Sequence, residues 1–543
     1  MILRKPLNFI SQLFNIFSKK LRNIYLNSNY YNKKISKISN NDLIYKPSPH
    51  LLSSLIKYQT KKINVEDISI ENIWNNENIN SENFRKLNNF YWFFSLDLKS
   101  SKKKTQKIIS DWIKKNFKYN AKSWELDLTS KRIISWLSNH NLTIKEDDEN
   151  YQYQFDKMIQ KQTNHLMNEI SKSEVVNDKM IGCAAIILVG LSYKDKKNYL
   201  SYGLNLLKRI SKFSFDNYGF PKSRNIKQLI FYLKYFILIR EWFKESQVDV
   251  PETIDETIYY LGQGYAFIWQ NIEFDILMNG NNISNNSEFD HYLKRLNYKF
   301  KNENKEFGGY AILRNKKISV VMDVGSSPPS KFSSNYQSGA LSFEINSNGK
   351  KLISNCGFYN KKNIQLAELS RSTATHSTLI IDDSSSCHYR KIGNKDFLTN
   401  HSLKIIKKNI IFEKNYWKIN SAHDGYQKKY NKIHEREIEF YPEQFKFIGT
   451  DKLLSKKKNL NIKFEIRFHI EPDVKLMKTQ DNKTILIELG DEGWKFSCDN
   501  YDINIDNGLY FGNKNSYTQN QNIFISGITN TQNENIVWQL NKI

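Results

Sequence analysis

Cysteine is scarce in this chain of 543 residues, and its four cysteines lie far apart. No two of them form a Cys-x-x-Cys pair, so the sequence has no motif for a structural zinc ion or a redox dithiol. A framework of disulfide bonds is not expected at this density. Cys183 lies in an apolar run and is expected to be a small buried side chain. The four residues are Cys183, Cys356, Cys387 and Cys498.

Long apolar runs are also missing, and none reaches the length that spans a bilayer. The first residues, MILRKPLNFISQLFNIFSKKLRNIYL, are basic and apolar, but no small-x-small cleavage site follows them. Polar residues also interrupt any signal-peptide core: Asn8, Ser11, Gln12 and Asn15. The apolar residues recur at helical spacing: Leu3, Leu7, Ile10, Leu13, Phe14, Phe17 and Leu21. Residues 1–45 are therefore predicted to form a basic amphipathic segment. It either contacts an anionic membrane surface or packs on the main body.

Negative charge is in short supply. Lysine and arginine number 81 against 56 aspartates and glutamates, which gives a formal net charge of +25. Such a field favours an acidic polysaccharide, a nucleic acid or an anionic lipid as partner. An AT-rich genome is the alternative explanation, because the chain is rich in Lys, Asn, Ile and Tyr. Neither zinc-finger spacing nor an aromatic RNA-binding signature occurs, so no nucleic-acid partner is expected.

The chain between about 46 and 295 has the apolar periodicity of helices. The predicted helical segments are Asn83–Leu98, Lys104–Phe117, Thr129–Ser138, 152–172, 176–194, 196–212, 225–245 and 252–273. Short loops join them. A series of helical hairpins of similar length indicates a toroid or a solenoid.

From Tyr310 onward the pattern changes to short strands that alternate with turns rich in Asn, Gly, Asp and Lys. The predicted strands include Ile318–Asp323, Leu341–Ile345, Lys351–Ile353, Thr378–Ile381, Ile405–Phe412, Ile438–Phe440, Phe464–His469, Thr484–Leu489 and Ile523–Ser526. This pattern predicts an all-β domain, either a sandwich or a barrel. Helices first and strands afterwards predict two segregated domains, with a boundary near Asn279–Phe307.

A series of motifs, in a fixed order along the chain, resembles those of one known family. WELDLTSKRIISWL (124–137) resembles the family's W-x-x-D-x-T-x-x-R-x-x-S-W-L segment, and residues 177–190 match its N-H-L-L-x-N-x-x-A helix in length. DNYGFPKSRNIK (216–227) matches its D-G-G-x-x-E-R-S-x-x-Y-H loop in position. AHDGY (422–426) and HER (434–436) resemble H-D-G-Y then H-x-R, and Arg467–His469, Pro472-Asp473 and Gly493-Trp494 complete the set. Over about 70–540 the chain therefore resembles heparinase II/III-like proteins, which are polysaccharide lyases and their relatives.

The resemblance implies an α+β multidomain protein, with a substrate cleft between its two domains. Residues 46–295 would form an incomplete α/α toroid and residues 306–543 an antiparallel β-sandwich. Lyases of this type cleave acidic, uronate-containing polysaccharides by β-elimination, which needs a carboxylate neutraliser, a base and an acid. The alternative is a catalytically impaired glycan-binding or envelope-polysaccharide assembly protein that keeps the cleft. The family is often exported to the cell envelope, whereas this N-terminus shows no signal, so the compartment and the oligomeric state stay open.

Asn177 lies where the family carries its neutralising asparagine, although an asparagine before a helix could equally be its N-cap. The family's catalytic Tyr-His pair falls on Ile226 and Lys227, and Ile226 cannot move a proton. A further family histidine falls on Gln337. His376 is the remaining candidate acid or base, with a buried structural histidine as the alternative. The predicted catalytic set is thus Asn177, His376 and Gln337.

Some relatives hold zinc with His, Asp and His, and the matching residues here are Gln337, Asn355 and His376. These are poor zinc ligands, so neither a catalytic metal nor a cofactor is expected. Cationic and polar residues that suit carboxylates and sulfates remain as the predicted substrate-binding set. They are Lys222, Arg224, Lys227, Arg371 and His423. Asn177 and the 219–227 loop are expected to face Gln337 and His376 across the cleft.

Overall fold

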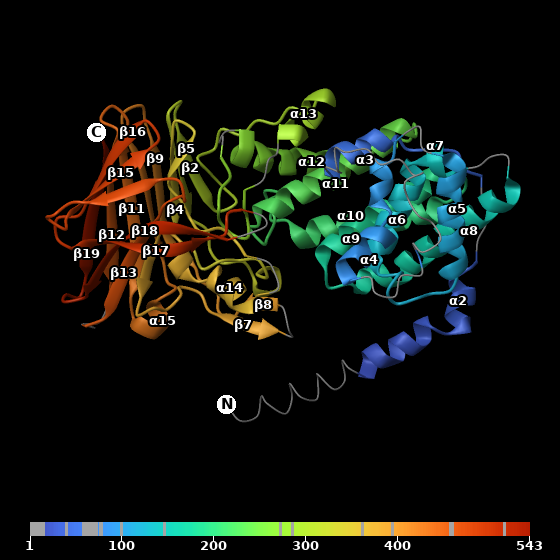
Figure 1. The fold of residues 1–543 in the computed structure, drawn as a ribbon, viewed down its shortest axis with the longest axis horizontal. Helices are drawn as coiled ribbons and strands as arrows, with labels where there is room; N and C mark the ends of the chain where they lie inside the picture. The colour runs from blue at the N-terminus through green and yellow to red at the C-terminus, as the bar shows by residue number, and fades with distance from the viewer. Residues whose placement is uncertain are drawn as a thin grey trace. The chain divides into compact units, whose positions relative to one another are not determined.

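A computed structural model describes most of the chain: residues 17–37, 42–56, 74, 80–97, 101–144, 148–270, 274–283, 287–359, 363–392, 396–455, 461–513 and 517–543. The chain divides into two compact units (Figure 1). The helical unit comprises Met1–Phe213, Tyr232–Ile258 and Ser287–Tyr298, and the strand unit comprises Ser214–Phe231, Tyr259–Asn286 and Lys299–Ile543. Two segments from the helical region of the sequence, 214–231 and 259–286, thus join the strands. The domain limits inferred from the sequence stay predictions.

The region before residue 300 is helical, as the 3.6-residue periodicity predicts. The helices are α2 (Asn29–Ile35), α3 (Pro49–Ile56), α4 (Ser81–Asn88), η2 (Tyr91–Ser95), α5 (Lys102–Lys115), α6 (Leu126–Ser138), α7 (His140–Thr143), α8 (Glu149–Glu169), η3 (Ile170–Lys172), α9 (Val176–Ser192), α10 (Lys197–Ser214), α11 (Ile226–Glu245), α12 (Glu252–Tyr265), η4 (Ala266–Gln270) and α13 (Ser287–Arg295). Residues 17–26, ahead of these elements, are helical as well. The toroid part of the predicted fold class is confirmed.

Trp136 and Arg132 of α6 pack against Trp112 of α5 in the core of the helical unit. Trp112 and Trp136 are fully buried and meet edge to face, with ring centroids 5.5 Å apart. Arg132 lies over the Trp112 ring at 4.0 Å and donates to the Gln162 Oε1 atom (2.9 Å) and the Asn88 carbonyl (2.8 Å). This buried guanidinium is therefore satisfied by carbonyl and amide oxygens. Its burial lowers the Arg132 pKa well below the ordinary value.

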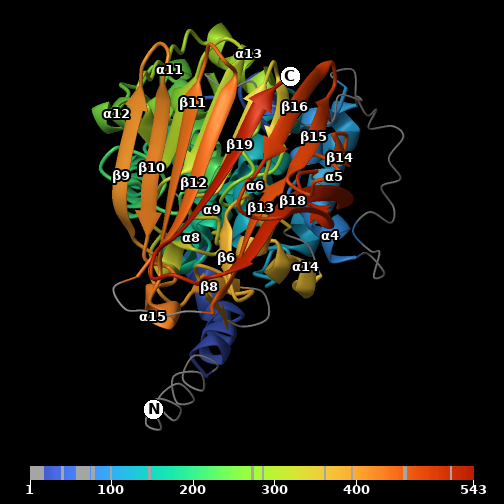
Figure 2. The same cartoon turned by 90° about the vertical axis from the view of Figure 1, so that its left-hand side faces the viewer.

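The strand unit consists of antiparallel sheets, and Figure 2 shows β9 to β12 and β19 side by side. The sheet orders are β14-β15-β16-β19-β12-β11-β10-β9, β1-β2-β3-β4-β5, β17-β18-β13-β6 and β7-β8. The strands are β1 (Glu306–Phe307), β2 (Tyr310–Arg314), β3 (Ile318–Asp323), β4 (Phe343–Ser347), β5 (Lys350–Ile353), β6 (Leu379–Ile381), β7 (Tyr389–Ile392), β8 (Asp396–Thr399), β9 (Ile405–Phe412), β10 (Trp417–His423), β11 (Ile433–Tyr441), β12 (Lys446–Leu454), β13 (Lys463–His469), β14 (Lys475–Lys478), β15 (Thr484–Leu489), β16 (Glu492–Ser497), β17 (Ile503–Tyr510), β18 (Thr518–Ile528) and β19 (Glu534–Lys542). Short helices η5 (Ser330–Phe332), α14 (Ile364–Leu369), η6 (Thr373–Thr375) and α15 (Gln427–Tyr430) interrupt the strands.

The strands bury one shared apolar core. Every second residue of β12 is buried, which is the pattern of a strand with one face inward. Phe343 of β4 stacks on Trp538 of β19, with ring centroids 5.5 Å apart, so two different sheets meet in this core. The predicted antiparallel sandwich is confirmed.

The hairpin between β4 and β5 is built as its sequence predicts. Asn348 and Gly349 have φ angles of 46° and 80°. Two consecutive left-handed residues define the tight turn that matches the twist of paired strands. Strands β4 and β5 pair across this Asn-Gly turn.

All four cysteines are buried free thiols, as expected for Cys183 in its apolar run. The Cys183 thiol contacts the Gly203 carbonyl at 3.1 Å. Among the helices that the structure describes, none combines the length and the apolar character needed to cross a bilayer.

Candidate functional site

The first turn of α9 carries Asn177. Helix α9 begins at Val176, and Val175 occupies the N-cap position, so the N-cap interpretation of Asn177 is wrong. The Asn177 side chain is exposed. Val175 has no side-chain oxygen to bond the first N–H groups of the helix. An uncapped helix N-terminus favours a negatively charged group, which suits a carboxylate ligand.

Charged side chains gather beside this turn and form what we call the α6–α9 cluster: Arg85, Asp127, Lys131 and Asp178. Asp127 Oδ2 accepts from Arg85 Nη2 at 2.9 Å, and its Oδ1 lies 2.7 Å from Lys131 Nζ. Asp178, the third residue of α9, is half-buried. Burial raises the pKa of its carboxyl to about 6, and the Asp127 charge adds to this, while Lys131 and Arg85 oppose it.

Two tyrosines lie next to the α6–α9 cluster. Burial raises the pKa of Tyr235, on α11, above its usual value, and the Asp127 charge adds to this. Lys131 Nζ lies 5.9 Å from the centre of the Tyr91 ring. This end of the helical unit therefore brings together an exposed amide, a carboxyl that titrates near neutrality, cations and protonated phenols. Such groups can neutralise a carboxylate and move protons.

In the strand unit, Arg224 ties the 214–231 segment to the strands. It has a left-handed φ of 58°, and its buried guanidinium lies 5.1 Å from the Tyr310 ring centroid. All five of its N–H groups have acceptors. They are the carbonyls of Gly308 (3.3 Å), Gly309 (2.8 Å), Gly325 (3.0 Å) and Ser326 (3.3 Å), and Asp323 Oδ1 (2.5 Å). Its predicted contact with substrate therefore gains no support from this geometry.

Replacing Arg224 with lysine should lower the free energy of unfolding by about 1–3 kcal/mol. Lysine keeps the charge near Asp323 but cannot reach four carbonyls with one ammonium group. Urea unfolding measures the change. Arg209→Lys, at an exposed position on α10, is the control and should stay within about 0.5 kcal/mol. Equal stability of the two variants would contradict a clamping role for Arg224.

Gln337 is fully buried, and its amide is used within the strand unit. Its Oε1 accepts from the Gly280 N–H at 3.0 Å, and its Nε2 donates to the carbonyls of Gly357 (3.0 Å) and Ser370 (2.6 Å). Both amide hydrogens therefore have acceptors, which leaves none for a substrate. The catalytic role of Gln337 stays a prediction without support in this geometry.

His376 is also buried, with only 1% of its surface exposed. Its Nδ1 lies 2.8 Å from the Ser372 carbonyl and must donate to it, so Nε2 is the unprotonated nitrogen. Among the described residues this Nε2 has no hydrogen-bond partner. Burial lowers the His376 pKa to about 4, and that of the nearby His469 to about 3. His376 is a neutral ring inside the protein, and its predicted catalytic role stays a prediction.

These low pKa values predict a loss of stability in acid. An unfolded histidine titrates near 6.5, so between about pH 6.5 and 4 the unfolded chain binds more protons than the folded one. The free energy of unfolding should therefore fall over this range, by about 3 kcal/mol for His376 alone. Urea midpoints at pH 7 and 4.5 should move less in His376→Asn than in the wild type. The exposed His291→Asn should keep the wild-type difference.

His423 belongs to a buried chain of hydrogen bonds that the H-D-G-Y and H-x-R motifs build. Its Nδ1 accepts from the Gly425 N–H at 3.0 Å, so its Nε2 carries the proton and faces His434 Nδ1 at 3.3 Å. His434 Nε2 then donates to Asp451 Oδ1 at 2.7 Å. Arg436 bonds both Asp451 oxygens, at 2.8 and 3.0 Å, and Trp538 donates to Oδ2 at 3.0 Å. Each of these five side chains is almost fully buried, so the predicted substrate contact of His423 gains no support either.

The other predicted cations differ in exposure. Lys222 and Lys227 are half-buried in the strand unit. The Asp216 carboxylate accepts from the N–H groups of Tyr218 and Phe220, and these bonds order the loop that precedes Lys222. Arg371 is buried, where it donates to the Ala367 carbonyl (2.7 Å) and the Ser334 carbonyl (2.9 Å). Its guanidinium lies 4.7 Å from the Phe358 ring centroid. The binding roles of these three cations stay predictions. So does the expectation that Asn177 faces His376, because the two lie in different units.

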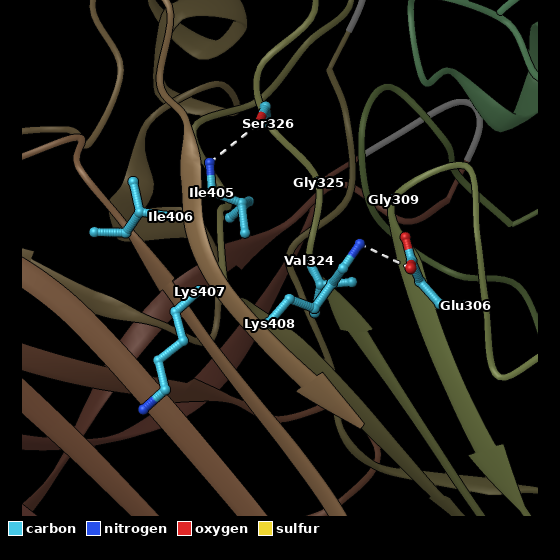
Figure 3. Close-up of a pocket in the computed structure, with 9 residues that line it drawn as sticks. All are labelled: Glu306, Gly309, Val324, Gly325, Ser326, Ile405, Ile406, Lys407 and Lys408. Atoms are coloured by element: carbon cyan, nitrogen blue, oxygen red, sulfur yellow. Dashed lines mark hydrogen bonds and ion pairs between the residues drawn. The ribbon is translucent and has the colours of Figure 1, made fainter. Parts of the chain in front are cut away.

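A hollow of about 350 Å³ opens in the strand unit between β9 and the residues that flank β2 and β3 (Figure 3). Lys408 Nζ reaches Glu306 at 2.7 Å, and the Ile405 N–H donates to Ser326 Oγ at 3.0 Å. The adjacent Lys407 points away from Glu306 and bonds Glu435 at 2.7 Å. Both lysines thus already have carboxylate partners, which makes the hollow a weak anion site.

Of the three residues that match the zinc ligands of some relatives, Gln337 and Asn355 use their side chains in hydrogen bonds within the protein. Asn355 donates to Glu344 Oε1 (3.0 Å) and accepts from the Ser377 N–H (2.8 Å). Within the described ranges, no group of three or more His, Cys, Asp or Glu side chains could hold a metal ion. The expectation that catalysis uses no metal or cofactor stays a prediction.

Comparison with known proteins identifies the fold. Several solved lyase structures share it over most of the chain, although no curated protein matches the sequence. A heparinase III gene product with methylated lysines has a TM-score of 0.68 and 14% identity, over 93% of this chain and 86% of its own. A mutant of the heparan sulfate lyase HepC from Pedobacter heparinus gives 0.66 and 14%, over 94% and 87%. A further heparinase III gives 0.65 and 14%, over 95% and 89%.

The fold is thus that of a polysaccharide lyase-like protein. Residues 305–539 match the family model described as heparinase II/III-like, C-terminal. Over these residues the chain matches the heparinase II/III-like family that its motifs predict. At 14% identity the structural likeness establishes the fold alone.

Sequence reasoning missed two features of the candidate site. It passed over Asp178, the residue after Asn177, and the Asp127 carboxylate that acts on it. Both residues lie inside the motifs that resemble the family, and each is an acidic residue in the first turn of a helix. That shared position was the signal in the sequence that could have identified them.

Proposed function

We propose that this protein acts on acidic, uronate-containing polysaccharides by β-elimination. The observation that carries the proposal is the start of α9, where the exposed Asn177 amide precedes a carboxyl group with a pKa near 6. The shared fold of proteins named heparinase III and heparan sulfate lyase supports it. A net charge of +25 favours an acidic polymer as partner.

The chemistry assigns a task to each group. The uronate carboxylate would bind at the uncapped first turn of α9, where the Asn177 amide donates to it as charge develops. Asp178, ionised above about pH 6, would take the C5 proton. The electron pair of the broken C5–H bond then forms the C4–C5 double bond, and the C4–O bond breaks. The leaving oxygen takes this proton from Asp178, or takes one from Tyr91 or Tyr235, and the tyrosinate then regains a proton from Asp178. Either route ends with both groups in their starting states.

A second candidate function is a catalytically impaired protein that binds glycans or serves in the assembly of envelope polysaccharide. The observation that favours it is that the residues at the other positions where the family has catalytic side chains are unsuited to catalysis. Ile226 stands at the position of the family's catalytic tyrosine and is buried, Gln337 is fully bonded, and His376 is enclosed. The protein would then keep affinity for an acidic polymer without cleaving it.

One comparison separates the two functions. The protein is incubated with alginate, heparan-type and hyaluronan-type polymers while the ultraviolet absorbance of the unsaturated product is recorded. The lyase function predicts a rise with at least one polymer. Retention of the protein on an immobilised polymer, reversed by salt and without any rise in absorbance, would establish the binding function instead.

A further inference from the structure

The helix over residues 17–26 presents an apolar stripe to solvent. Phe17, Leu21 and Ile24 are 61%, 52% and 68% exposed. Their spacing of four and three residues places them on one face of the helix. Large apolar side chains that lie exposed together on one face of a helix indicate a surface that binds a protein or a membrane.

The opposite face of the same helix is fixed to the helical unit. Leu26 is buried, and Arg22 Nε donates to Glu169 of α8 at 2.7 Å. The following helix α2 continues this attachment, because the buried Tyr31 hydroxyl bonds His165 Nδ1 at 2.8 Å. The buried apolar residues of this region thus begin at Leu26, and the stripe before them stays outward.

The charge of this segment indicates what binds to the apolar stripe. Residues 17–37 contain six lysines and arginines and no aspartate or glutamate. Five of the six are exposed: Lys19, Lys20, Lys33, Lys34 and Lys37. Tyr30, 70% exposed, adds an amphipathic ring of the kind that favours a membrane–water boundary.

We propose that the 17–26 helix docks on an anionic lipid surface. The apolar stripe would enter the boundary between headgroups and acyl chains, and the lysines would meet the lipid phosphates. A second copy of this chain is a poorer occupant, since a segment with five exposed lysines and no acidic residue repels a copy of itself. In the sequence the same apolar spacing continues toward the N-terminus through Ile10, Leu13 and Phe14, which lie outside the described residues.

Vesicle co-sedimentation of the full chain tests this. Phosphatidylcholine vesicles with about one third phosphatidylglycerol should bind the wild type at least about tenfold more tightly than pure phosphatidylcholine vesicles. The triple variant Phe17→Ser, Leu21→Ser, Ile24→Ser and the double variant Lys19→Glu, Lys20→Glu should each bind about tenfold more weakly.

The matched control for charge is Lys103→Glu, Lys107→Glu, which removes the same charge from an exposed face of α5. It should bind like the wild type. Circular dichroism melting confirms that each variant is folded. The proposal is overturned if the wild type ignores anionic vesicles, or if the control weakens binding as much as the Lys19, Lys20 variant. It is also overturned if the apolar triple variant changes only self-association, as measured by light scattering. None of these readouts depends on polysaccharide cleavage.

Discussion

Replacing Asp451 with alanine should destabilise the strand unit by about 3–5 kcal/mol. Asp451 receives four hydrogen bonds, two from Arg436 and one each from His434 and Trp538. All four side chains are fully buried. The alanine variant therefore leaves the buried Arg436 charge without its carboxylate, although the carbonyls of Leu341 and Ser377 still bond it, and leaves two buried N–H groups without an acceptor. The loss of stability is larger than that from removing one hydrogen bond, because burying a charge without its counter-charge costs more free energy than leaving a neutral group unpaired.

Acid should act on the same carboxylate. Burial alone would raise the Asp451 pKa, but the Arg436 guanidinium and the His434 bond hold it well below its usual range. The stabilisation is therefore present above the unfolded pKa of about 3.9 and is lost as pH falls below that value.

Thermal melting of Asp451→Ala, Asp451→Asn and Glu488→Ala checks the prediction. Asparagine keeps the shape of the aspartate side chain and some of its hydrogen bonds. The Asp451→Asn variant therefore still measures the contribution of the charge if the alanine variant does not fold. Glu488 on β15 is exposed and pairs with Lys475 at 3.0 Å, so its loss should be worth less than about 1 kcal/mol. Similar melting points for Asp451→Ala and Glu488→Ala would show that the network is dispensable.

Periodicity predicts most of the fold because each element buries one face. The strand Ile405–Phe412 was predicted at its observed limits, and α5 and α9 within two residues. Local pattern carries no information about contacts between distant segments. Arg224 bonds carbonyls about a hundred residues later in the chain, and this contact joins 214–231 to the strands. No spacing within the sequence reveals it.

The candidate site was only partly predictable for the same reason. Motif position singled out Asn177, and it does lie in the first turn of a helix with an exposed side chain. Motif position also singled out Arg224, Gln337 and His423, whose bonding atoms are used inside the protein. A residue type suited to a ligand is equally suited to a buried carbonyl, and only packing distinguishes the two cases.

Replacing Asn177 with alanine should lower the rate of unsaturated-product formation by about 10²–10⁴-fold if the protein is a lyase. The variant removes the amide that would stabilise the developing charge on the uronate carboxylate. Stability should change little, since the side chain is exposed. Asn198→Ala is the matched control, because Asn198 is also the exposed second residue of a helix, α10. It should leave the rate unchanged.

Asp178→Asn should lower the rate by a similar factor and also change its pH dependence. A base must be ionised, so the wild-type rate should fall as pH drops below about 6, the pKa of Asp178. The asparagine variant lacks this titrating group and should lose that limb of the profile. Glu174→Gln, an exposed acid just before α9, should keep both the rate and the limb. Purely structural roles for Asn177 and Asp178 would lower stability and rate together without moving the pH profile, and that outcome would remove both residues from the mechanism.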